Sequence, residues 1–395
     1  MNLSGKITDG SAYKRGGGNS LLDFYLSAAF VMYISLVVGS YLTGNGNLIR
    51  TLYALSFFLL PVSFAFFRFR ARSHELLTLT FVFFLIKLYL LKTLVTGDEI
   101  YAKAFAPLAG ISIALMFYRL LDNNPRALLK ILYIIFFGTF LYIVHQFFFL
   151  SVNPNDIFLG GSRNHITDFL LAVFVLWALS YTKVNLKQKE PEKIQSLLGY
   201  LLVLLTIGLL ITLTGRTGVL ISGFMLIWVI TISFYQPGVF RKIKYKRILN
   251  VCFVIGAGAI AFIYISPYVE FFAINRLLES GLESRGRLIV NSYFIENLSS
   301  GFFGLPYYSV QTAVGLTWHS SFIEIVVHYG FIGMVTAIIY LLYAIFHSVR
   351  KRPIAGMLVI PILFRSFFDD SLFNPLLIVA FFVWVLIVTE PKLTK

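Results

Sequence analysis

The sequence contains a single cysteine, Cys252, which lies inside an apolar run. One thiol cannot build a disulfide framework within the chain, and it cannot supply a cysteine metal site. The sequence also lacks the G-x-x-x-x-G-K-[ST] element with which ATP-driven proteins hold phosphates. An ATP-driven pump contained in this one chain is therefore excluded.

Charged side chains are scarce as well. They make up 13% of the 395 residues, whereas a soluble domain carries about 25%. Apolar residues make up 58%, and they are grouped in blocks of about 20, the length with which a helix crosses roughly 30 Å of hydrocarbon. The strands of a membrane β-barrel would show shorter, alternating segments. The sequence therefore predicts an all-α, polytopic integral membrane protein.

The apolar runs and the breakers between them predict about twelve transmembrane helices. They cover residues 21–43, 48–67, 76–95, 104–121, 128–150, 166–182, 197–214, 217–235, 248–267, 319–346, 354–368 and 372–389. The predicted organisation is an N-terminal tail (1–20), nine transmembrane helices (21–267), a large loop with an amphipathic helix (268–318), three further transmembrane helices (319–389) and a C-terminal tail (390–395).

Acidic residues are few, with 18 Asp and Glu against 33 Lys and Arg. In a soluble protein this excess would suggest a nucleic-acid partner, but the cytoplasmic loops of membrane proteins also collect Lys and Arg. With the N-terminus inside, the inner segments carry 23 basic residues and the outer segments carry 9. We therefore expect both termini in the cytoplasm, the 268–318 loop on the outer side, and no nucleic-acid partner.

The outer loop contains a candidate phosphate site. After Gly286, the spacing of Leu288, Ile289, Ser292, Ile295 and Glu296 suits an amphipathic helix that lies at the outer interface with its apolar face toward the membrane. Arg285 and Arg287 stand at its start, where guanidinium groups add to the preference of a helix N-terminus for anions. An interfacial anchor that contacts lipid headgroups is the alternative interpretation.

Arg216 is a second candidate, in the sequence Thr214-Gly215-Arg216-Thr217-Gly218 between two apolar runs. The glycines permit a tight turn that holds the arginine at the outer membrane boundary. Burying an arginine there costs a few kcal/mol unless it meets water or an anion. The alternatives are an anion site that faces the bundle and simple snorkelling to the interface.

Polar residues also open the predicted tenth helix. His319 follows Trp318 on the outer side, and an imidazole there can act as a general base near neutral pH. Glu324 lies within the same helix, where a carboxylate is either functional or paired with an arginine. Alternatively, His319 is only a polar residue at a helix start beside an interfacial tryptophan.

Further charged residues lie outside these candidate sites. Asp369-Asp370 could hold a cation but is more typical of a solvated turn. The cluster at 163–165 is predicted to be a loop, and Asp168 and Lys87 are charges within or near the membrane without a nameable partner.

Three sequence elements follow one another in a specific order. The first is Gly-Arg-Thr-Gly at 215–218, which is similar to the pattern [ST]-R-[ST]-G. The second is Gly286-Arg287 with a helix and then Gly-Phe-Phe-Gly-Leu-Pro-Tyr at 301–307. The third is His-Ser-Ser-Phe at 319–322 with Tyr-Gly-Phe-Ile-Gly at 329–333. Together they resemble the O-antigen polymerase and O-antigen ligase superfamily of bacterial envelope proteins. The resemblance covers 210–335, and the chain departs from it at Ser299-Ser300, Pro306 and Ser320.

The resemblance implies an inner-membrane enzyme that performs inverting, metal-independent glycosyl transfer at the periplasmic face, without a cofactor. The donor would be a glycan on undecaprenyl diphosphate. It implies that Arg216, Arg287 and Arg285 stabilise the charge that builds on the diphosphate, and that His319 deprotonates the acceptor hydroxyl. Glu324 is the weaker candidate for the base. The substrate-binding residues would be Arg285, Glu324, Trp318 and Tyr307.

Three functions agree with this pattern. A polymerase would extend lipid-linked repeat units together with a chain-length regulator and a flippase, and this is the reading we favour. A ligase would move finished glycan to the lipid A-core. A lipid-linked-oligosaccharide flippase also fits twelve spans, although transporters usually contain internal repeats and we find none.

Overall fold

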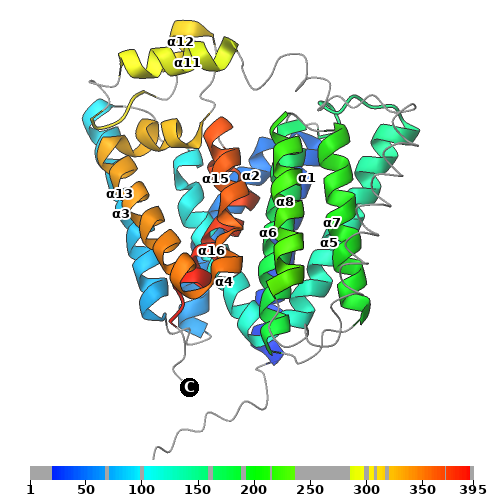
Figure 1. The fold of residues 1–395 in the computed structure, drawn as a ribbon. Helices are drawn as coiled ribbons and strands as arrows, with labels where there is room; N and C mark the ends of the chain where they lie inside the picture. The colour runs from blue at the N-terminus through cyan, green and yellow to red at the C-terminus, as the bar shows by residue number, and fades with distance from the viewer. Residues whose placement is uncertain are drawn as a thin grey trace, which may run out of the picture.

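The computed structural model describes residues 20–66, 71–97, 102–158, 163–187, 193–213, 216–235, 285–297, 302–306, 309–315, 320–369 and 371–391. The regular secondary structure of this described part is all helical, with no β-strand, which confirms the all-α class (Figure 1). The first half of the chain forms α1 (Ser20–Thr43), α2 (Gly46–Phe66), α3 (Ser73–Thr96), η1 (Ala102–Phe105), α4 (Ala106–Asn123), α5 (Pro125–Val144), η2 (His145–Phe149), α6 (Arg163–Lys187), α7 (Lys193–Leu213) and α8 (Arg216–Tyr235). The second half forms α11 (Arg285–Glu296), α12 (Ser309–Val314), α13 (Ser321–Lys351), α14 (Pro353–Gly356), α15 (Val359–Phe368), η4 (Ser371–Phe373) and α16 (Pro375–Thr389).

Short capping signals separate the long apolar runs. The Asn124 side chain accepts a hydrogen bond from the N–H of Ala127, and Pro125 starts α5. Asn374 caps α16 in the same way, again with a proline directly after it. Gly97 ends α3 with a left-handed φ of 69°. Each cap satisfies backbone groups that a helix end leaves unpaired, so each fixes a boundary.

Six helices of the described part are long and apolar enough to cross a membrane. They are Leu21–Thr43, Ser73–Thr96, Ala102–Asn123, Pro125–Phe149, Asn164–Lys183 and Ser321–Lys351. Four shorter apolar helices complete the pattern: Leu198–Leu213, Thr217–Ile232, Pro353–Phe368 and Pro375–Thr389. The predicted ninth transmembrane helix, 248–267, lies outside the described residues, so the total of twelve stays a prediction.

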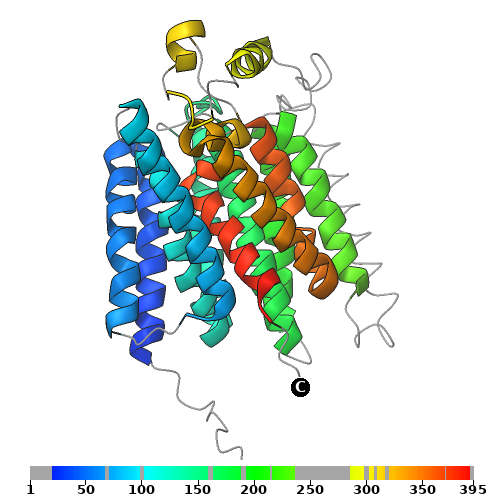
Figure 2. The same cartoon turned by 90° about the vertical axis from the view of Figure 1, so that its left-hand side faces the viewer.

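The helices stand side by side in one bundle, with α11 and α12 lying beyond one end of it (Figures 1 and 2). We call that end the α11 face and the other end the opposite face. The short helix α16 is almost entirely buried and packs against α4, α6 and α13. Helix α1 starts at the opposite face, and α8 and α16 both end at that face. Helix α11, the next described helix after α8, lies at the α11 face.

Two of the predicted transmembrane helices are broken. The predicted tenth helix is α13, which bends at Gly330 (φ 71°, ψ −178°) into a first arm, 321–329, and a second arm, 331–351. The first arm lies across the bundle end at the α11 face, and the second descends through the bundle (Figure 1). The predicted eleventh helix is divided into α14 and α15 by a turn at Met357 and Leu358. Apolar length alone could not show these breaks.

A network of ion pairs joins the helix ends at the opposite face. The carboxylate of Glu75 is fully buried and lies 2.5 Å from Arg119 Nη2, and Lys183 pairs with Asp122. Glu390, just after α16, pairs with the Arg352 guanidinium at 2.7 Å. These basic residues come from segments that the sequence analysis assigned to one side of the membrane, and the structure places them on one face.

Candidate functional site at the α11 face

A buried arginine lies at the end of α15 that points to the α11 face. Arg365, in the last turn of α15, has an exposed side-chain fraction of 0%. Its Nε lies 2.7 Å from Asp168 Oδ1 on α6, and its Nη2 lies 3.0 Å from Asp369 Oδ2. A buried guanidinium is tolerated only with such partners, because removal from water costs several kcal/mol per ion.

Asp168 joins this arginine to two further elements. Its Oδ1 accepts a hydrogen bond from Ser371 Oγ in η4 at 2.9 Å, and its Oδ2 accepts one from Asn374 Nδ2, the cap of α16, at 3.4 Å. The sequence analysis found no partner for this carboxylate. The structure shows that it connects α6, α15, η4 and α16 at one point.

The start of α6 corrects one prediction. Residues 163–165 are not a loop but the first turn of α6, which begins at Arg163. The ring of His165 stacks on Tyr41 with centroids 5.0 Å apart, and its Nδ1 lies 4.0 Å from Asp168 Oδ2. These contacts hold the polar segment in helical form, and they could not be read from the local sequence.

The helix that carries Arg216 reaches the same cluster. Arg216 is the first residue of α8, and the structure describes only its backbone. The next residue, Thr217, is buried, and its Oγ1 lies 3.5 Å from Arg365 Nη1 as a weak hydrogen-bond acceptor. The first turn of α8 is therefore located beside the buried arginine, while Thr214 and Gly215 lie outside the described residues.

The start of α13 is hydrogen-bonded to Asp369, which pairs with Arg365. The N–H and Oγ of Ser321 both donate to the carbonyl oxygen of Asp369, at 3.0 and 2.9 Å. Ser320 is the N-cap residue of α13, so His319 directly precedes the cap. His319, Trp318 and Tyr307 themselves lie outside the described residues.

Asp369 is thus part of an ion pair and a helix junction, which disfavours the cation site considered for Asp369-Asp370. Asp370 lies outside the described residues. Among the residues that the structure describes, no group of three or more His, Cys, Asp or Glu side chains could hold a metal ion.

Glu324 lies in the first arm of α13 and is 1% exposed. Its Oε1 lies 2.7 Å from Lys103 Nζ in η1, so the cation is a lysine and not the arginine that we considered. The hydroxyl of Tyr329 donates to the carbonyl of Ala104 at 2.7 Å. Both bonds hold η1 against the first arm.

Helix α11 places Arg285 and Arg287 in its first turn, with only their backbone described. The side of α11 that packs on the protein is not the side that carries Ile289 and Ile295. Val290 is buried, whereas Ile289 and Ile295 are 48% and 68% exposed. The helix contains two overlapping apolar stripes, and the one that includes Val290, Tyr293 and Phe294 faces the rest of the protein. Periodicity alone could not choose between these stripes.

The second and third sequence elements touch each other. The carbonyl of Phe302 accepts a hydrogen bond from the N–H of Phe331 at 3.1 Å. Val290 of α11, Leu305, Val310 of α12 and Val327 of α13 form one buried cluster. Leu305 of the segment 302–306 therefore packs between α11, α12 and the first arm of α13.

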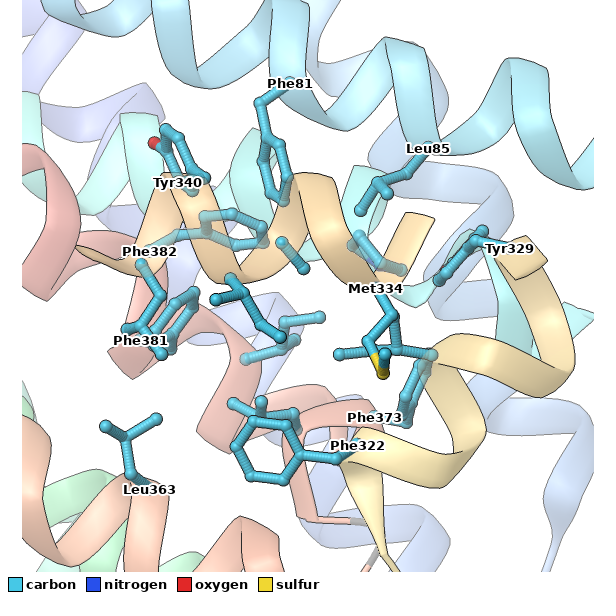
Figure 3. A pocket seen from close by; sticks show the side chains of 17 residues that line it. Phe81, Leu85, Phe322, Tyr329, Met334, Tyr340, Leu363, Phe373, Phe381 and Phe382 are labelled. Atoms are coloured by element: carbon cyan, nitrogen blue, oxygen red, sulfur yellow. The ribbon is translucent and has the colours of Figure 1, made fainter. Parts of the chain in front are cut away.

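An apolar cavity of about 70 Å³ lies between the two arms of α13, on the inside of its bend at Gly330 (Figure 3). We call this bend the elbow of α13. Phe322 and Tyr329 reach it from the first arm, Met334 and Tyr340 from the second arm, and Phe81 from α3. The tyrosine hydroxyls bind elsewhere, Tyr329 to Ala104 and Tyr340 to Thr78 Oγ1 at 2.7 Å. The cavity therefore presents hydrocarbon and aromatic rings, which suit an apolar chain.

Sequence reasoning missed three cations at this face. Arg365, Lys103 and Lys92 were counted only as outer basic residues, yet Arg365 and Lys92 are buried. A partial signal existed for Arg365, since Asp369 follows it by one helical turn. No comparable local signal marks the partners of Lys92 and Lys103, because these lie more than 200 positions away.

The described parts of all three sequence elements thus lie at one end of the bundle. Arg365 and Asp369 connect the start of α8 with the start of α13, and 302–306 connects α11 with the first arm of α13. Comparisons of the chain with protein-family models, with curated proteins and with solved structures found no match.

Proposed function

We propose that the protein is a glycosyltransferase of the bacterial inner membrane that polymerises undecaprenyl-diphosphate-linked oligosaccharide repeat units, such as those of O-antigen, at the periplasmic face. In this proposal both termini are cytoplasmic and the α11 face is periplasmic. A chain-length regulator and a flippase are the expected protein partners. The protein belongs in function with the O-antigen polymerase and ligase superfamily that its sequence resembles.

One observation carries the proposal. The helix starts that bear Arg216 and Arg285–Arg287, and the segment that directly follows His319, are assembled at the same face of the bundle. They are separated in sequence by up to about a hundred residues, so local sequence does not require them to meet. Their assembly is what a shared site for one substrate requires.

The arginines stabilise the leaving group. Transfer breaks the bond between the anomeric carbon and the diphosphate oxygen, and negative charge builds on the diphosphate. Arg216 and Arg287, with Arg285 as a further contact, neutralise that charge by bidentate hydrogen bonds. Each stands in the first turn of a helix, where the unpaired N–H groups and the helix dipole add to the attraction for an anion.

His319 accepts the proton of the acceptor hydroxyl as that oxygen attacks the anomeric carbon from the face opposite the diphosphate. This inverts the anomeric configuration and needs no metal. Glu324, buried and paired with Lys103, positions the first arm of α13 below the substrate. Trp318 and Tyr307 provide aromatic surface for the sugar rings.

The cavity in the elbow of α13 accommodates part of the polyprenyl tail (Figure 3). It lies below the first arm, while Glu324 is on that same arm. An apolar cavity beside a charged site fits a substrate that has a diphosphate joined to a hydrocarbon chain.

The direct test uses purified protein in proteoliposomes with a lipid-linked repeat unit and no added metal. A series of lipid-linked oligomers that forms in the presence of EDTA, and that His319→Ala abolishes, is the expected result. No oligomers from a correctly folded protein would refute the proposal. Formation of a single product only when lipid A-core is added would indicate the ligase instead.

One structural feature favours a second candidate, the flippase. The bend of α13 at Gly330 and the division between α14 and α15 are discontinuities of the kind that form substrate sites in transporters. The two breaks lie toward opposite ends of the bundle, however, and not at a common midplane position (Figure 1). Movement of the intact lipid-linked unit across the vesicle membrane without oligomer formation would support this candidate.

A further inference from the structure

Lys92 is a buried cation bound to two backbone carbonyl groups. It lies in the last turns of α3, and its exposed fraction is 2%. Its Nζ donates to the carbonyl oxygens of Leu305 at 2.7 Å and Val327 at 2.8 Å. Because a buried ammonium group is costly unless it is hydrogen-bonded, these contacts are strong determinants of the local structure.

The bend of α13 explains why Val327 accepts this bond. In an unbroken helix the Val327 carbonyl would accept from the N–H of Phe331, four residues later. Gly330 has a backbone conformation that is essentially restricted to glycine, and the Phe331 N–H donates instead to the carbonyl of Phe302. The Val327 carbonyl thus accepts from Lys92 Nζ in place of the Phe331 N–H. The Phe331 N–H in turn donates to the Phe302 carbonyl in place of the Val327 carbonyl.

Two glycines allow the segments to approach this closely. A Cβ atom at Gly304, whose φ is 111°, would lie 2.8 Å from the Val327 carbonyl oxygen and 2.9 Å from Lys92 Cδ. A Cβ atom at Gly330 would lie 2.5 Å from the Phe302 carbonyl oxygen. An alanine at either position would therefore force 302–306 away from the first arm of α13.

The same segment carries α11. Leu305 and Val327, whose carbonyls bind Lys92, also pack their side chains with Val290 of α11 and Val310 of α12. From these contacts we infer that Lys92 is a positioning residue that clamps 302–306, and with it α11, onto the first arm of α13. The clamp fixes the position of the first turn of α11 relative to the start of α13.

The consequence for catalysis rests on the proposed function. There, Arg285 and Arg287 hold the diphosphate from α11, and His319 takes the acceptor proton directly before α13. Loosening the clamp leaves each group present but changes the distance between them. Because misplacement by about 1 Å can cost a hundredfold in rate, kcat should fall by about 10- to 100-fold, with little change in the donor KM.

The clamp itself is tested by a distance measurement that does not depend on activity. Spin labels at Ile295→Cys on α11 and Ile339→Cys on the second arm of α13, in a Cys252→Ser background, report the position of α11. Both label sites are exposed, at 68% and 62%. In nanodiscs, Lys92→Met should shift or broaden the distance distribution. Lys87→Met, the matched control at an exposed lysine of the same helix, should not.

A second pair of variants tests the clamp from the loop side. Gly304→Ala should produce the same change as Lys92→Met. Gly315→Ala shares a positive φ of 69°, but its Cβ would meet no atom within 4 Å, so it should leave the distance unchanged. Each variant is first checked for a monodisperse elution profile.

The outcomes separate the clamp from the proposed function. Unchanged distances in both Lys92→Met and Gly304→Ala would overturn the clamp, whatever the activity. Changed distances with an undiminished kcat would overturn the positioning role. A wild-type protein that makes no oligomers would refute the proposed function, while the distances alone would still decide on the clamp.

Discussion

Arg365 Nε lies 2.7 Å from Asp168 Oδ1, and this buried contact joins two helices whose paired residues are 197 positions apart in the chain. The pair lies between the start of α8 and the start of α13, so it supports both sides of the candidate site. Removing one partner from such a pair leaves an uncompensated buried charge, which costs about 3–5 kcal/mol.

Arg365→Gln should therefore lower the stability by about 3–5 kcal/mol, since it leaves the carboxylates of Asp168 and Asp369 without their cation. Asp168→Asn should cost less, because Asp369 still faces the guanidinium. Thermal unfolding of the protein in detergent measures both. Asp156→Asn, at an exposed carboxylate near the same face, is the control. Equal unfolding temperatures for Asp168→Asn and Asp156→Asn would contradict this account of the pair.

Arg216→Ala should reduce glycan transfer by about 10²- to 10³-fold, the loss typical for removal of one group that stabilises transition-state charge. Arg216→Lys should lie between alanine and wild type, because lysine keeps the charge but not the bidentate geometry. Arg50→Ala, at an exposed arginine near the start of α2, should leave the rate unchanged. Wild-type rates in Arg216→Ala would remove this residue from the mechanism.

Filling the elbow cavity should weaken binding of the lipid-linked donor. Met334→Trp places a larger side chain in a cavity of about 70 Å³, and we expect the donor KM to rise several-fold with a smaller effect on kcat. A donor with a shortened prenyl chain should be less sensitive to this change. Ile339→Trp, on the exposed side of the same arm, serves as the control. Equal KM values for the two tryptophan variants would place the lipid tail elsewhere.

The proposed orientation can be tested by labelling single cysteines in intact cells. In a Cys252→Ser background, Ile295→Cys on α11 should react with a membrane-impermeant maleimide. Asn123→Cys, exposed at the opposite face, should react only after the cells are permeabilised. This follows from the concentration of basic residues in segments that meet at the opposite face. The reverse pattern of labelling would invert the topology.

Much of the bundle could be predicted from the lengths of the apolar segments. A transmembrane segment must pair its own backbone groups as a helix, so it requires a long run of apolar residues. The bend at Gly330 could not be predicted from the sequence, because glycine is common in membrane helices and its φ here depends on the contact with Phe302. The side of α11 that packs against the protein could not be predicted, for a related reason. Both of its apolar stripes satisfy helical spacing, and only the partners Leu305 and Val327 select one.

The site was only partly predictable. Intramembrane charges such as Asp168 and Glu324 could be recognised as significant, because unpaired charges are costly in a membrane. Their partners, Arg365 and Lys103, could not be named, because the pairing depends on which helices become neighbours. The arginines at 216, 285 and 287 could be singled out from their positions at predicted helix starts near the outer boundary, and the structure places those helix starts at one face.

The central claim is tested most directly by the lipopolysaccharide profile of the bacterium that carries this gene, before and after deletion and after restoration of the gene. The account predicts that the ladder of long glycans collapses to core plus a single repeat unit, that wild type restores it, and that Arg216→Ala and His319→Ala do not. An unchanged ladder in the deletion strain would contradict the assignment to this polysaccharide. Bare core with accumulated long lipid-linked glycan would identify a ligase instead of a polymerase.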